Sequence, residues 1–272
     1  MAADTHASNG DRPSSAHGGA SRPAPPPVRI AATGDIHCTQ RDRARIADAF
    51  AKVAPEADLI VIAGDVTTHG EAAEAEVLAE ACRPLGVPVI AVLGNHDWHA
   101  GQQQEIAAAL GAGGIEVLDR SSTTRPLDQG EVGIVGTKGF IGGFPGSHLT
   151  DFGEPALRQA YAETSAEVAA LDAGLREVAN CPYRLVVLHY SPVAATLEGE
   201  PPGIWTFLGS DRLAAPILEH EPDLVVHGHA HAGTFEGRVG EVPVYNVSVP
   251  VMERDFWVFE LAGQRQPTSP IH

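Results

Sequence analysis

The sequence predicts an α/β fold, in which helices cover a largely parallel β-sheet. Short apolar runs rich in Val and Ile alternate with longer stretches whose apolar residues recur at helical spacing. Three strand-and-helix units of this kind follow one another between residues 28 and 110. Successive units of this type place parallel strands side by side, with the helices packed on the sheet.

In the first part of the chain, strands are predicted at 28–33, 59–63 and 87–93, and helices at 42–53, 71–85 and 102–110. The run at 59–63 reads LIVIA and has no polar residue, which is typical of a strand buried on both faces. The helix at 42–53 carries Ile46, Ala49, Phe50 and Val53 on one side. These residues are therefore expected to pack on the sheet.

In the second part, strands are predicted at 115–118, 132–135, 184–189, 224–226, 242–249 and 256–261, and helices at 154–178 and 211–219. Two long loops, 136–150 and 191–209, are rich in Gly, Pro and aromatic residues. Two interpretations of the first loop are open. In the first interpretation this loop covers a functional site; in the second it is a surface turn closed by the packing of Phe140 and Phe144.

The domain organisation follows from length and composition. Residues 1–27 are rich in Ala, Ser, Gly, His and Pro, a composition that predicts a disordered tail. Residues 28–262 suit a single domain with its own core, and residues 263–272 form a polar C-terminal tail. The sequence contains no heptad pattern, so the oligomeric state stays open.

Charge and cysteine content restrict the partners. The chain has 18 Lys and Arg against 35 Asp and Glu, a net charge of −17, which opposes binding of long nucleic acids. The three cysteines show no paired spacing, which favours a reducing compartment. No apolar run approaches the roughly 18 residues of a membrane span. We therefore expect a cytoplasmic protein that does not bind membranes.

Residue types that commonly bind metals follow the apolar runs. They are Asp35 and His37, Asp65, Asn95 with His96, His189, and His229 with His231. Each has a simpler explanation when taken alone: an aspartate after glycine often serves a turn, and a histidine that ends a strand is often a hydrogen-bonded core residue. Their recurrence at strand ends favours one convergent site. Carboxylate and imidazole ligands suit two ions such as Mn, Fe or Zn better than Ca.

In order, these motifs read D-x-H at 35–37, GD at 64–65, GNH followed by an acid at 94–97, the lone His189, and GHxH at 228–231. This series resembles the signature of the calcineurin-like metallophosphoesterase superfamily over nearly the whole region 28–261. The resemblance implies a four-layer αββα sandwich of two mixed β-sheets flanked by helices. It also implies a bound cofactor of two divalent metal ions drawn from Mn, Fe, Zn or Ni.

The resemblance further implies roles for individual residues. The first metal would be held by Asp35, His37, Asp65 and His231, and the second by Asp65, Asn95, His189 and His229, so that Asp65 bridges the two. A metal-bound hydroxide would attack phosphorus in line. The catalytic residues would be His96, which would either protonate the leaving oxygen or stabilise charge there, and Asp97, as the partner that would orient His96.

Departures from the signature narrow the predicted substrate. Protein Ser/Thr phosphatases of the superfamily carry GD-x-x-DRG and GNHE, whereas this chain has GDVTTHG at 64–70 and GNHD at 94–97. The chain looks more like the bacterial branch that includes cyclic-nucleotide and broad-range phosphodiesterases. We expect hydrolysis of small phosphodiesters or phosphomonoesters, with two alternatives: protein-phosphatase-like activity, or a non-catalytic metal-binding scaffold. Lys138, Arg212 and Arg254 are the basic residues near the predicted site loops.

Overall fold

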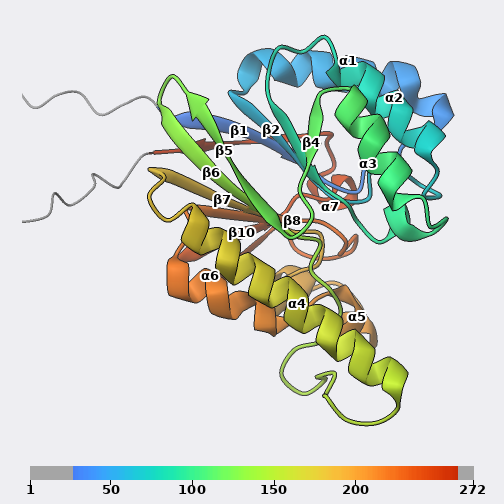
Figure 1. The fold of residues 1–272 in the computed structure, drawn as a ribbon, viewed down its shortest axis with the longest axis vertical. Helices are drawn as coiled ribbons and strands as arrows, with labels where there is room; N and C mark the ends of the chain where they lie inside the picture. Colours follow the sequence, from blue (N-terminus) through green and yellow to red (C-terminus); the bar gives the residue numbers. More distant parts are fainter. Residues whose placement is uncertain (1–26, 263–272) are drawn as a thin grey trace, which may run out of the picture.

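Two β-sheets lie face to face between two layers of helices (Figure 1). The structure is a computed structural model of the 272-residue chain and describes residues 27–262. The predicted tails at 1–27 and 263–272 lie outside the described residues, apart from Pro27. Within the described range, no helix combines the length and the apolar character that a membrane crossing requires.

The first sheet has five strands in the order β11-β1-β2-β3-β4. Strands β1 to β4 are parallel, and β11 pairs with β1 in the antiparallel sense. The fully buried run in β2 agrees with its position between two parallel neighbours. The strands are β1 (Val28–Thr33), β2 (Leu59–Ala63), β3 (Val89–Val92), β4 (Ile115–Val117) and β11 (Trp257–Leu261).

The second sheet has six strands in the order β5-β6-β7-β8-β10-β9. Its four central strands are parallel, whereas β5 and β9 are antiparallel edge strands. The strands are β5 (Ser121–Leu127), β6 (Gly130–Gly136), β7 (Tyr183–Val187), β8 (Leu224–His227), β9 (Glu236–Val239) and β10 (Val242–Asn246). Aliphatic residues from the facing sides of both sheets, such as Val61 and Leu185, form the core between them.

Helices α1 (Arg43–Val53), α2 (Ala72–Cys82) and α3 (Gln103–Ala112) cover the outer face of the first sheet (Figure 1). They bury Phe50, Leu78 and Ile106 in a core that they share with the outer face of this sheet. Helices α4 (Pro155–Glu177) and α6 (Ala214–His220) cover the second sheet, where Leu171 and Ile217 are buried. The N-terminal part of α4 projects beyond the sheets (Figure 1), and the short α5 (Trp205–Leu208) lies between β7 and β8 in the chain.

Short helical turns complete the fold. They are α7 (Val249–Met252) and the 3-10 turns η1 (Gln40–Asp42), η2 (Ala54–Glu56), η3 (His96–Trp98), η4 (Ala194–Leu197), η5 (Pro202–Ile204) and η6 (Asp211–Leu213). The four-layer sandwich of two mixed sheets is confirmed. Strands β5 and β9 were not predicted, because edge strands with one solvated face lack the apolar runs of the central strands. The predicted strand at 242–249 ends at Asn246.

Candidate metal centre

Side chains from five strand ends meet at one edge of the two sheets. Two groups of ligand atoms, each within 4.8 Å of one another, are formed by Asp35, His37, Asp65 and His231, and by Asp65, His189 and His229. Asp65 belongs to both groups. Because β1, β2, β7 and β8 are parallel within their sheets, their carboxyl ends deliver these residues to the same place. Either group has the composition of a site for a divalent transition metal.

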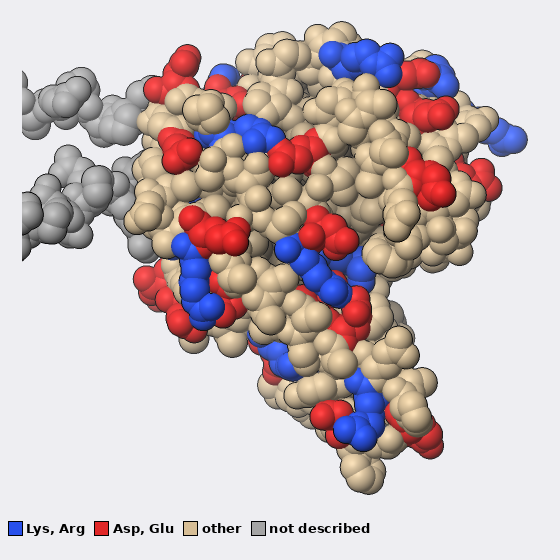
Figure 2. Space-filling model, in the orientation of Figure 1, with Lys and Arg blue, Asp and Glu red and all other residues tan. Residues whose placement is uncertain are grey.

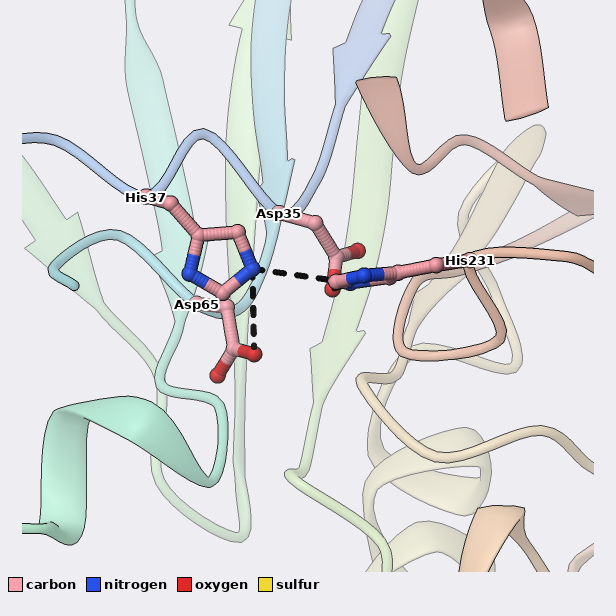
Figure 3. A group of neighbouring side chains, drawn as sticks. All are labelled: Asp35, His37, Asp65 and His231. Carbon is pink, nitrogen blue, oxygen red and sulfur yellow. Dashed lines mark hydrogen bonds and ion pairs between the residues drawn. The ribbon is translucent and has the colours of Figure 1, made fainter. Parts of the chain in front are cut away.

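The first group lies around the loop after β1 (Figure 3). Nε2 of His231 is 2.8 Å from Oδ1 of Asp35. Nε2 of His37 is 3.8 Å from Oδ2 of Asp65 and 3.5 Å from Nε2 of His231. The imidazole and carboxylate groups converge on a common volume in Figure 3. A cation in that volume would meet nitrogen and oxygen donors from three separate loops.

The second group is organised by the buried ring of His189. Its Nδ1 lies 3.0 Å from the carbonyl oxygen of Ala63, which can only accept, so Nδ1 donates the hydrogen bond. The lone pair of Nε2 therefore faces the site, 3.4 Å from Oδ1 of Asp65 and 2.7 Å from Oδ1 of Asn95. A carbonyl partner on the far nitrogen is the usual way to orient a metal-binding histidine. The structure thus brings Asn95 to the second group.

His229 is oriented in the same manner by the backbone of Phe207, in the second long loop. Its Nε2 donates to the carbonyl oxygen of Phe207, 3.1 Å away, which leaves Nδ1 as the nitrogen with a free lone pair. The ring of Tyr190 packs against it, with ring centres 4.4 Å apart. A backbone carbonyl has no residue-specific signal, so only its location in the loop 191–209 hinted at a role. Tyr190 could have been suspected from its position next to His189.

The electrostatics of the centre favour a bound cation. Burial raises the pKa of the Asp65 carboxyl to about 6 and lowers the pKa of the His37 and His229 imidazoles to about 4 and about 3. Burial would also raise the pKa of Asp35, but the hydrogen bond from His231 keeps that pKa below its ordinary value. Metals bind neutral imidazoles and ionised carboxylates, so the lowered pKa values of the two histidines favour metal binding. A divalent cation would also offset the cost of burying two carboxylates together.

The backbone at the centre is held in an unfavourable conformation. Asp35, His37, Asp65 and His229 have φ angles of 54°, 46°, 48° and 72°, in the left-handed region that non-glycine residues rarely occupy. Hydrogen bonds from Asp35 N to Gly64 O and from His37 N to Asp65 O, each 3.0 Å long, hold the first two loops together. Such strain is common where a site has to be preorganised.

Two glycines give the carboxylates room. A Cβ atom on Gly94 would lie 2.1 Å from Oδ1 of Asp65, and one on Gly228 would lie 2.2 Å from Oδ2 of Asp35. Both distances are far inside van der Waals contact. The glycines that precede Asn95 and His229 in the motifs are thus required by the close approach of a carboxylate from another strand.

His96 lies beside the centre, with its Nε2 4.0 Å from Oδ2 of Asp65. Its Nδ1 donates to the carbonyl oxygen of Thr68 over 2.9 Å, which leaves Nε2 facing the site. The sequence assigned the orienting role to Asp97, but the structure gives it to Thr68. Instead, the buried Asp97 accepts hydrogen bonds from Val66 N, Thr67 N, Thr67 Oγ1 and Gly94 N, at 2.6–3.2 Å.

Asp97 therefore connects the loop after β2 to the loop after β3, and so positions Asp65 relative to Asn95. Burial raises the pKa of its carboxyl, and the hydrogen bonds from Thr67 and Gly94 act against that rise. A carboxylate that receives several N–H donors is a common means of fixing two loops. The hydrogen bonds of the Asp97 carboxylate go to backbone amides and to Thr67 Oγ1, and the ring of His96 is hydrogen-bonded to Thr68 O.

The two long loops pack on each other next to the centre. Gly143 N donates to Gly209 O over 2.8 Å, and Gly142 N donates to Thr206 O over 3.0 Å. Phe144 is buried in a small cluster with Leu208. Of the three basic candidates, Arg212 stacks on Tyr161 and Arg254 stacks on Trp257. Lys138 alone of these three lines a cavity next to Asn95.

A sequence model of the calcineurin-like phosphoesterase family matches residues 28–233. The match covers most of the chain, and the site motifs lie within it. This protein therefore belongs to the calcineurin-like phosphoesterase family, and the resemblance seen in the sequence is confirmed. Members of the family typically bind divalent metals, in agreement with the two ligand groups.

Solved structures share the fold. Phosphopantetheinyl hydrolase (PptH) from Mycobacterium tuberculosis is 17% identical, with a TM-score of 0.65 over 90% of this chain and 99% of that one. The protein TT1561 of Thermus thermophilus is 19% identical, with a TM-score of 0.52 over 86% and 99%. GAP50, the anchor in the inner membrane complex of Plasmodium, is 12% identical, with a TM-score of 0.53 over 83% and 72%. A comparison with curated proteins found no match.

Proposed function

We propose that the protein is a dinuclear-metal-dependent phosphoesterase that hydrolyses small phosphodiesters or phosphomonoesters. The observation that carries the proposal is the position of Asp65, whose carboxylate belongs to both ligand groups. In this assignment Asp35, His37 and His231 complete the first metal site. Asn95, His189 and His229 complete the second.

Individual residues of the chain then have separate roles in the reaction. Two divalent ions, when bound, would lower the pKa of a water toward ~7 and neutralise charge on the phosphoryl oxygens. In its imidazolium form, His96 donates the Nε2 proton to the leaving oxygen and keeps its Nδ1–H bonded to Thr68 O. Asp97 keeps Asp65 and Asn95 at a fixed separation through its backbone contacts.

The proposed substrate is a small phosphoester and not a long nucleic acid. The net charge of −17 opposes a polyanion. On the face drawn in Figure 2, basic side chains are interspersed with acidic ones, so this face offers no continuous basic path for a phosphate backbone. A small ester needs positive charge only at the centre itself.

All three cysteines are buried free thiols, which supports the expected cytoplasmic location.

The test is metal analysis of the purified protein, paired with hydrolysis of bis(p-nitrophenyl) phosphate and p-nitrophenyl phosphate. Both substrates are assayed after addition of Mn, Ni, Zn or Mg to chelator-treated protein. Metal-dependent turnover of either substrate is the expected result, and the ratio of their kcat/KM values measures the diester preference. His69→Ala serves as the control, because this exposed imidazole pairs with Glu74 and belongs to neither ligand group.

A protein that binds two metals and hydrolyses neither substrate would contradict the proposal in this form. That result would favour the scaffold alternative, which the fold similarity to GAP50 also allows. Hydrolysis of phosphoserine peptides in preference to both small esters would favour the protein-phosphatase alternative.

A further inference from the structure

A cavity of about 390 Å³ opens beside the second ligand group. Asn95 stands on its border, so the cavity adjoins the place where the phosphoryl group of a substrate would bind. Trp98, Phe140 and Tyr190 form aromatic walls, and the N-terminal half of α4 closes the opposite side. The volume is within the range of pockets that hold small organic ligands.

The amine of Lys138 lies among these aromatic walls. Its Nζ is 4.4 Å from the ring centre of Phe140, 5.2 Å from that of Tyr190 and 5.8 Å from that of Trp98. The residue is only 9% exposed, which is unusual for lysine. Burial lowers the pKa of its amine, and the charges of Glu167 and Glu163 act against that decrease.

The hydrogen-bonding capacity of Lys138 is largely unused within the described residues. An ammonium has three N–H donors, and among residues 27–262 the acceptor in reach is Gly139 O, at 3.1 Å. No ion pair joins Nζ to a carboxylate in this range. Glu163, which also lines the cavity, and Glu167 pair instead with Arg120. Aromatic faces attract the charge but do not accept its N–H groups as an anion would. The remaining donors are available to a ligand in the cavity.

We propose that this cavity binds the organic group of the substrate, and that Lys138 selects esters whose organic group carries a second anionic group on an aromatic or apolar body. The proposal rests on the proposed function only for the reaction at the adjoining centre. The aromatic walls suit the body of the group. The buried ammonium suits a carboxylate or a second phosphate at its end, because a charge-assisted hydrogen bond is strongest where water is excluded.

The test compares three esters that differ at one position: 4-carboxyphenyl phosphate, its uncharged isostere 4-carbamoylphenyl phosphate, and 1,4-phenylene bisphosphate. The expected wild-type preference for the carboxylate over the amide is roughly tenfold in kcat/KM, and Lys138→Met is expected to reduce that ratio to about one. The bisphosphate shows whether a second phosphate serves equally well. Lys138→Arg, which keeps the charge, should retain part of the preference.

The matched control is Arg158→Met, which also removes one positive charge and lies on α4, but pairs with the exposed Asp151 outside the cavity. It is expected to keep the wild-type ratio. Unfolding temperature and metal content are measured for every variant, and Lys138→Gln replaces Lys138→Met if the latter does not fold.

A binding measurement separates this inference from the proposed function. Titration calorimetry with 4-carboxyphenylphosphonate and phenylphosphonate, which are not hydrolysed, reports the preference of the cavity without turnover. Tighter binding of the carboxylated ligand by wild type but not by Lys138→Met supports the inference even if no ester is hydrolysed. Equal affinities in wild type, no binding of either ligand, or a preference that survives Lys138→Met would overturn it.

Discussion

The backbone amide of His96 donates a hydrogen bond to Oδ1 of Asp65 over 2.8 Å. The residue proposed to protonate the leaving group is thus fixed directly to the carboxylate shared by the two ligand groups. Movement of Asp65 would disturb both metal binding and proton transfer. Metal binding and proton transfer can nevertheless be tested separately. His96 bonds to Asp65 through its backbone amide, whereas proton transfer would use the His96 ring.

Asp65→Asn tests the shared carboxylate. The substitution keeps the size of the side chain and removes its charge, so both proposed metals lose the negative charge of the shared carboxylate, and a neutral amide oxygen is a weaker bridging group. We expect metal content to fall from about two equivalents per chain to less than one, with kcat/KM reduced by at least ~10²-fold. Plasma emission analysis after dialysis measures the metal, with His69→Ala as control. Retention of two full equivalents would show that Asp65 is not a bridge.

His96→Ala tests the proton donor. Its ring belongs to neither ligand group, so metal content should stay at the wild-type value. We expect kcat to fall by roughly 10²- to 10⁴-fold for an alkyl ester, whose leaving oxygen needs a proton, and by less for a p-nitrophenyl ester. Parallel kinetics with the two leaving groups provide the measurement. An equal loss for both would argue against proton donation, and unchanged hydrolysis would exclude the role of His96.

Gly94→Ala tests the close approach of Asp65. The added Cβ would lie 2.1 Å from Oδ1 of Asp65, so the carboxylate or the loop must move. We expect a loss of roughly 1–3 kcal/mol in the free energy of unfolding and weaker metal binding. The control is Gly111→Ala in α3, where a Cβ meets nothing within 4 Å and the helix should gain up to ~1 kcal/mol. Similar results for the two variants would refute the steric argument.

The pH dependence of the metal-free protein follows from its buried histidines. Burial lowers the pKa of His227 to about 4 and that of His229 to about 3, whereas both bind protons below about pH 6.5 in the unfolded chain. Between about pH 4 and 6.5 the unfolded state therefore binds more protons at these residues. Their contribution to the free energy of unfolding rises with pH across this window.

Asp65 acts in the opposite direction, because burial raises its pKa to about 6 and the folded state keeps its proton longer. Burial also raises the pKa of Asp97, which acts in the same direction as Asp65, and lowers the pKa of His37 to about 4, which acts with His227 and His229. Three histidines outweigh two carboxyls, so the free energy of unfolding should increase by roughly 1–3 kcal/mol from pH 4.5 to 6.5. Urea unfolding with a chelator present measures the change. Greater stability at pH 4.5 than at pH 6.5 would show that these histidines do not stay neutral when buried.

The sequence by itself determined the α/β class, the central strands and the residues at their ends. Runs such as LIVIA in β2 predict buried strands because local hydrophobicity is enough to identify them. The edge strands β5 and β9 were not predicted from the sequence, because their polar faces interrupt the apolar pattern. The division into two stacked sheets came from the family resemblance, because strand order depends on contacts between residues far apart in the chain.

Only the tertiary structure decided how the side chains are used. It showed that Thr68 O, and not Asp97, accepts from the ring of His96. It also placed Lys138 in a cavity built by four separate segments of the chain. Motifs identify which residues gather at a strand end, but hydrogen-bond partners and buried charges are set by packing between distant segments. No local pattern encodes those distances.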